Sequence, residues 1–165
     1  MTTRELSLAK LSGMLRDSNG LVRQKARRRL IARGEESAEV FLKCLSEDPQ
    51  ARLEGVKGLF ALSDPKTVDQ LVELLHDENH ALRWIAGEAL IRIGKPSLIP
   101  ILRGLEAHPT HDNFFEGAHH VLHELALAAY WFGVLGELHK AMEGDYAARL
   151  EVPRLALKAL EQLGA

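Results

Sequence analysis

Apolar residues recur four positions apart in several segments of the chain, with a small side chain at the centre of each pattern. In residues 77–94, Leu82, Ala86 and Leu90 have this spacing, which places them on one face of an α-helix. A small residue in mid-helix lets a neighbouring helix approach closely. Apolar clusters upstream, such as residues 68–75, predict a partner helix for each segment. The pattern therefore predicts an all-α chain of paired helices.

The same pattern returns with a period near 30 residues. Residues 17–34 align with residues 77–94 without a gap, and residues 152–164 follow the same frame. Shorter and more diverged copies begin at Asp48 and Asn113. The anchor leucines of the five copies are separated by 29, 31, 32 and 38 residues, and they are Leu30, Leu59, Leu90, Leu122 and Leu160. Two helices in a period of this length are typical of helical-repeat proteins.

These copies predict one domain over residues 1–165, a short solenoid (α-α superhelix) of about five helix pairs. The repeats are expected to cover residues 3–34, 35–63, 64–95, 96–127 and 128–165. One boundary stays open, because no Gly, Pro, Asn or Asp lies between Leu122 and Tyr130. Either a helix continues through this segment, or a turn forms there from residues that do not favour one.

Residues 71–94, LVELLHDENHALRWIAGEALIRIG, resemble a HEAT repeat of the phycobilisome-lyase subclass. The subclass pattern has an Asp in the turn and an Arg six residues later. Two copies match it, a third has its Arg two residues early, and the last two have none; the arginines are Arg23, Arg52 and Arg83. The resemblance implies a scaffold function, with the second helix of each pair lining a concave face and the arginines in one row.

Two roles for this arginine row are open. Each Arg bridges to the turn Asp of its own or an adjacent repeat, or the row contacts a protein partner on the concave face. In the second interpretation Trp84, next to Arg83, is an anchor, because tryptophan is frequent among the residues that dominate binding energy at interfaces. Packing of Trp84 between repeats is the alternative for that residue.

Positive charge is concentrated near the N-terminus. Residues 1–34 contain nine Lys/Arg and two Asp/Glu, although the whole chain has a net charge of −2. With Ala26 and Leu30 facing the core, Arg23, Arg27 and Arg28 are expected to point away from it and to form a basic patch. A solvated terminal face, an acidic protein partner and a nucleic acid could each explain this patch. The sequence pI near 6.4 argues against nucleic acid.

Histidines are concentrated in the fourth repeat, since six of the eight lie between His108 and His139. His119 and His123 are one helical turn apart, and Glu116 and His120 form the adjacent ridge. Imidazole with carboxylate suits Zn, Fe or Ni. We therefore expect a transition-metal site from Glu116, His119, His120 and His123, with Glu88, His108, His111 and Asp112 nearby. A pH-responsive surface and a polar face without special chemistry are the alternatives.

Signatures of catalysis are missing from the sequence. It has no phosphate-binding GxxxxGK loop, no GxSxG elbow and no HExxH helix. Cys44 lies in an apolar segment and is expected to be a packing residue. The leading hypothesis is a non-catalytic protein-binding scaffold or adaptor with no cofactor. A metal-binding protein or metalloenzyme and a bilin-lyase-like accessory subunit are the alternatives.

A cytoplasmic, soluble protein is expected from three further features. The single cysteine excludes an internal disulfide and fits a reducing compartment. The N-terminal residues show no apolar run typical of a signal peptide. The longest apolar run, residues 125–136, is shorter than the roughly 20 residues that a membrane span needs.

Overall fold

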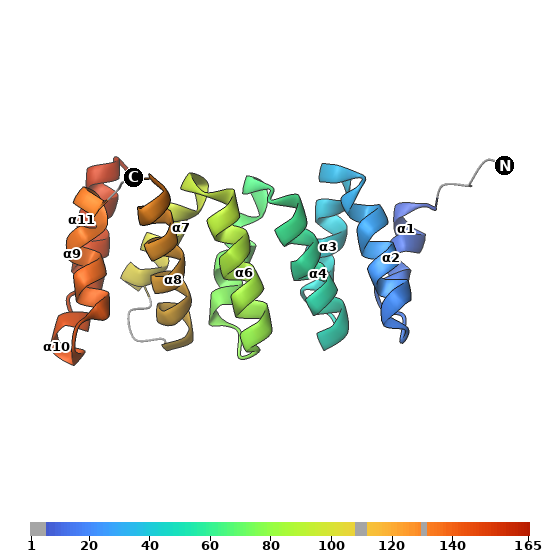
Figure 1. The fold of residues 1–165 in the computed structure, drawn as a ribbon, viewed down its shortest axis with the longest axis horizontal. Coiled ribbons are helices and arrows are strands. Elements are labelled where there is room, and N and C mark those ends of the chain that lie inside the picture. The colour runs from blue at the N-terminus through green and yellow to red at the C-terminus, as the bar shows by residue number, and fades with distance from the viewer. Residues whose placement is uncertain (1–5, 108–111, 130–131) are drawn as a thin grey trace. The chain divides into compact units, whose positions relative to one another are not determined.

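The computed structural model describes residues 6–107, 112–129 and 132–165 (Figure 1). Over these residues the chain forms eleven α-helices, four short 3-10 helices and no strand, which confirms the predicted all-α class. The chain divides into two compact units, Met1–Thr67 and Val68–Ala165. None of the described helices combines the length and apolar character required to span a membrane.

The first unit consists of two helix pairs, of which the second helices, α2 and α4, also pack against each other. Its elements are α1 (Leu8–Met14), α2 (Gly20–Ile31), η1 (Gly34–Ser37), α3 (Ala38–Cys44), α4 (Pro49–Leu62) and η2 (Pro65–Thr67). The predicted anchor residues are fully buried here: Ala26, Leu30 and Leu59. Asn19 and Asp48 accept hydrogen bonds from backbone N–H groups in the first turns of α2 and α4, so each begins its helix as an N-cap.

Helices α3 and α4 pack closely because α4 carries glycine where it meets Phe41. A Cβ atom added to Gly58 would lie 2.3 Å from the Phe41 ring, and one added to Gly55 would lie 2.7 Å from the Phe41 carbonyl oxygen. Both distances are well inside van der Waals contact. The two glycines therefore set the separation of this helix pair.

The second unit contains the remaining helices. They are α5 (Val68–Glu73), η3 (Leu74–His76), α6 (His80–Ile93), η4 (Lys95–Ser97), α7 (Leu98–Ala107), α8 (Asp112–Ala129), α9 (Phe132–Glu143), α10 (Tyr146–Arg149) and α11 (Val152–Leu163). The boundary left open after Leu122 is resolved, because α8 continues to Ala129. Leu82, Ala86 and Leu90 are buried in α6 as predicted.

Helices of the second unit lie in two layers. α6 packs beside α8, and α8 beside α9, whereas α5 packs beside α7, and α7 beside α11 (Figure 1). The sequence frame instead makes α11 the second helix of its pair, which would place it beside α8. Only two residues separate α8 from α9, and so short a connection favours antiparallel neighbours. α9 therefore occupies the place next to α8, and α11 packs against α7 and α9.

Candidate functional site

The long helix α8 presents two polar ridges to two different neighbours. Residues three or four apart share a helix face, and adjacent residues do not. His120 contacts Glu88 of α6, and Glu116 lines a hollow between α6 and α8. His119 and His123 instead contact α9. The structure therefore does not assemble the predicted metal ligands Glu116, His119, His120 and His123 into one group.

On the ridge of α8 formed by Glu116 and His120, the His120 ring supports Trp84 of α6. The Trp84 and His120 rings stack with their centroids 5.0 Å apart and their planes 18° apart. His120 Nε2 in turn donates a hydrogen bond to Glu88 Oε1 at 3.0 Å. Trp84 nevertheless keeps 52% of its surface exposed. The indole is thus supported on one face by α8 and open to solvent elsewhere, and its role as a binding anchor stays a prediction.

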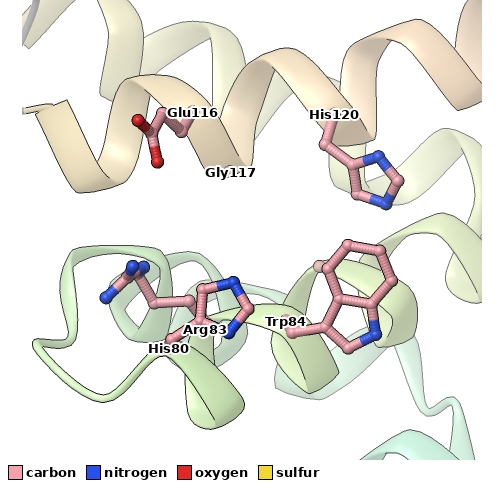
Figure 2. A pocket seen from close by; sticks show the side chains of 7 residues that line it. His80, Arg83, Trp84, Glu116, Gly117 and His120 are labelled. Carbon is pink, nitrogen blue, oxygen red and sulfur yellow. The ribbon is translucent and has the colours of Figure 1, made fainter.

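A hollow of roughly 170 Å³ lies beside this stack, between α6 and α8 (Figure 2). The aromatic pair lies at one end, and Arg83 and Glu116 lie at the other (Figure 2). Its lining residues, two of which are glycines, are His80, Arg83, Trp84, Gly87, Glu116, Gly117 and His120. It is smaller than the 300–1,000 Å³ typical of small-molecule sites. Its size suits a single inserted side chain better than a cofactor.

Arg23 and Arg83 stabilise equivalent turns in two copies of the repeat. Arg23 Nη1 donates to two turn carbonyl oxygens at 2.7 and 3.1 Å, and Arg83 Nη1 does so at 2.8 and 3.0 Å. The carboxylates of Asp17 and Asp77 accept from backbone N–H groups two residues later, both at 2.8 Å. Each of these two arginines therefore binds the carbonyl oxygen of its own turn Asp. The predicted bridge to the carboxylate of a turn Asp, in the same or an adjacent repeat, stays a prediction.

Arg52 has a related position in the third turn of this kind. Its Nε donates to the carbonyl oxygen of Leu45 at 3.0 Å. All three arginines of the predicted row thus engage the backbone that precedes their helix. The predicted partner site of Arg23, Arg52, Arg83 and Trp84 stays a prediction.

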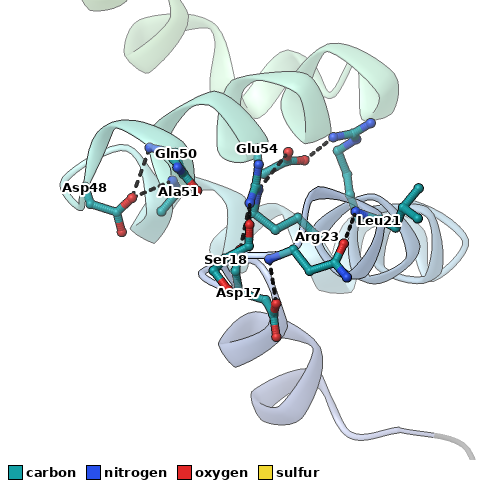
Figure 3. A network of polar contacts seen from close by, with 10 residues as sticks. Asp17, Ser18, Leu21, Arg23, Asp48, Gln50, Ala51 and Glu54 are labelled. Atoms are coloured by element: carbon teal, nitrogen blue, oxygen red, sulfur yellow. Dashed lines mark hydrogen bonds and ion pairs between the residues drawn. The ribbon is translucent and has the colours of Figure 1, made fainter.

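The basic helix α2 is partly neutralised by Glu54 of α4, which is only 5% exposed (Figure 3). Arg27 Nη1 forms an ion pair with Glu54 Oε2, and Arg23 Nε lies 3.6 Å from Glu54 Oε1. Arg23 and Arg27 therefore do not point freely into solvent as expected, because the face that carries them packs toward α4. Arg28 is exposed as expected. The predicted acidic partner would have to contact Arg28 and its exposed neighbours Lys25 and Arg29.

The second ridge of α8 forms a histidine cluster with α9. His123 Nδ1 and His139 Nε2 share a hydrogen bond of 3.1 Å, and His139 Nε2 lies 3.3 Å from Glu143 Oε1. The His119 and His139 rings stack with centroids 5.1 Å apart. Among the described residues, His119, His139 and Glu143 each offer a donor atom within 4.8 Å of the other two. We call His119, His123, His139 and Glu143 the α8–α9 cluster.

His119 is the least satisfied member of the α8–α9 cluster. Its Nε2 is shielded from solvent and has no hydrogen-bond partner. Burial lowers the pKa of His119 below its ordinary value, and the nearby His139 lowers it further. His119 is therefore held as a neutral imidazole with an unused polar atom.

His139 and Glu143 were not among the predicted metal ligands, although their spacing in the sequence could have indicated them. They are four residues apart on one helix, just as His119 and His123 are. What the repeat frame lacked was the packing of α9 directly on α8, which brings these two pairs together. The predicted contributions of His108 and His111, and of the Asp112 side chain, lie outside the described residues.

Cys44 is a buried packing residue at the end of α3. Burial, together with the nearby carboxylate of Glu47, raises the pKa of its thiol to about 11. A thiol with so high a pKa is a poor nucleophile at neutral pH. The expectation of a plain packing role is consistent with this environment.

Comparison with known proteins identifies the repeats. A family model described as HEAT repeats matches residues 38–122, which is just over half of the chain. No curated protein matches the chain. The match extends from the start of α3 into α8, and so includes the Trp84 hollow.

Proposed function

The chain belongs to the HEAT-repeat family, and from that premise we propose that it is a non-catalytic scaffold that binds a partner protein. HEAT repeats commonly mediate protein interactions. The proposed docking surface is the α6–α8 face of the second unit, centred on Trp84. Helical-repeat proteins bind their partners on extended surfaces, and not in enclosed pockets.

The exposed and oriented indole of Trp84 is the observation that carries this proposal. Tryptophan gives a large apolar contact area at low entropic cost, because few rotatable bonds must be fixed on binding. Here His120 already fixes one face of the ring, and Glu88 fixes His120. The surface is thus pre-organised, which lowers the cost of association.

The adjoining hollow suggests how a partner engages this face. Its roughly 170 Å³ could accept one apolar side chain packed against Trp84. Arg83 and Glu116 at the far end offer charges of opposite sign (Figure 2), which favours a partner segment of mixed polarity over a uniformly charged one.

Affinity capture with the full chain as bait tests the proposal. Proteins bound by the parent and quantified by mass spectrometry should be lost from Trp84→Ala. Leu157→Ala is the matched control, because Leu157 is a 43% exposed apolar residue on α11. Circular dichroism should show the same helix content for both variants. Equal capture of the same proteins by Trp84→Ala and the parent would show that the partner does not use this face.

A further inference from the structure

We propose that the α8–α9 cluster binds one divalent transition-metal ion, Zn²⁺ in the first instance, and that the ion pins α8 to α9. The ligands would be the imidazoles of His119, His123 and His139 and the carboxylate of Glu143. This site is separate from the Trp84 hollow and does not depend on the proposed protein-binding function. The two meet only in α8, which turns one ridge to each.

Donor atoms around His139 are spaced much as they would be around a tetrahedral ion. Zinc–nitrogen bonds of 2.0–2.1 Å at tetrahedral angles place neighbouring donor atoms about 3.3–3.4 Å apart. The separations from His139 Nε2 are 3.1 Å to His123 Nδ1 and 3.3 Å to Glu143 Oε1. The donor atoms of His119, His139 and Glu143 all lie within 4.8 Å.

The state of His119 supports the same conclusion. Its shielded Nε2 lacks a partner, and buried polar atoms in native proteins are nearly always satisfied. A metal ion in the cluster would give this nitrogen a partner.

The helices hold the four ligands on a firm frame. Each helix contributes two ligands one turn apart, His119 with His123 and His139 with Glu143. Next to the ligands, α8 and α9 pack so closely that only a gap of about 10 Å³ remains between them. It is lined by His139 and by the apolar residues Leu122, Ala126, Leu135, Leu138 and Met142. Metal sites require this kind of rigid support to keep their ligands in register.

The ligand set also indicates the kind of ion and its role. Imidazole and carboxylate ligands without thiolate suit Zn²⁺, Ni²⁺ or Cu²⁺ better than Mg²⁺ or Ca²⁺. Four protein ligands fill a tetrahedral ion, and closed sites of this kind are structural, whereas catalytic ones keep a position open. The competing account is a hydrogen-bonded histidine network that binds no metal.

Zinc titration of the full chain, made without a His-tag and stripped with a chelator, separates these accounts. Competition with a chromophoric chelator should show uptake of one Zn²⁺ per chain at micromolar protein. Co²⁺ in its place should give the intense visible bands of a four-coordinate ion. Protein that takes up neither ion at micromolar concentration would overturn the proposal.

Single substitutions then locate the site. His139→Ala and His119→Ala should each weaken Zn²⁺ binding by at least tenfold, because loss of even an outer-shell partner typically costs 10–100-fold. His120→Ala is the matched control on the opposite ridge of α8 and should leave the affinity unchanged. Glu143→Gln, whose side chain is 56% exposed, should also weaken binding and avoids any disturbance of the core. An equal loss in His120→Ala, or full affinity in Glu143→Gln and His139→Ala, would refute the assignment.

Discussion

Arg27 provides a sharp test of whether the basic face of α2 is structural. Arg27→Ala leaves the carboxylate of Glu54, only 5% exposed, without its closest partner. Removing one partner of a buried ion pair typically costs 3–5 kcal/mol. Two features reduce that figure here: Arg23 Nε stays 3.6 Å from Glu54, and the Arg27 side chain is 18% exposed. We therefore expect a loss of about 2–3 kcal/mol.

Urea unfolding followed by circular dichroism measures this loss, and two further variants interpret it. Arg28→Ala, one position along α2 and exposed, should stay within about 0.5 kcal/mol of the parent. Arg27→Ala combined with Glu54→Ala should be more stable than Arg27→Ala alone, because the buried carboxylate that lost its closest partner is then absent. Equal stability of Arg27→Ala and the parent, or equal losses for Arg27→Ala and Arg28→Ala, would refute this reasoning.

Three further predictions concern the cores of the two units. Leu90→Ala should lose ~2–5 kcal/mol in the same unfolding assay, because Leu90 is fully buried in α6. Gly58→Ala should lower the free energy of unfolding by about 1–2 kcal/mol, because the added Cβ would lie 2.3 Å from the Phe41 ring. This clash outweighs the ~1 kcal/mol by which alanine favours a helix over glycine. Gly136→Ala is the control and should not be destabilised, because its Cβ would have no neighbour within 4 Å. The Cys44 thiol keeps its proton in the fold up to a pKa of about 11, against an ordinary value of 9.0. Its contribution to stability is thus complete below pH 9 and is lost as the pH rises toward 11, so the parent should lose more stability than Cys44→Ala over that window.

The helices and their buried faces could be predicted from the sequence, because each repeat carries its own local signals. Leu82, Ala86 and Leu90 are buried as their spacing indicates. Val152, Ala156 and Leu160 are also buried in α11. Their frame matches α11 to α6, yet α11 packs against α7 and α9. Periodicity reports which face of a helix is buried but not which helix covers it, and here the short α8–α9 connection decides that.

The candidate site shows the same limit. Four-residue spacing correctly separated His119 and His123 from Glu116 and His120 as two ridges of one helix. It could not show that the ridges face different neighbours, one toward Trp84 and the other toward His139. The arginines were ambiguous for a related reason. A positive side chain looks solvent-exposed in sequence until the helix that carries its partner, as α4 carries Glu54, is known to pack beside it.

Photo-cross-linking from position 84 tests the central claim, that a partner protein docks on the α6–α8 face, most directly. A photoreactive phenylalanine analogue would replace Trp84 in one variant and Leu157 in another, with each full-length chain expressed and irradiated in cells. We expect a discrete cross-linked product from position 84 that is absent or much weaker from position 157. Cross-links from position 157 alone, or from neither position when the parent captures partner proteins, would contradict docking at Trp84.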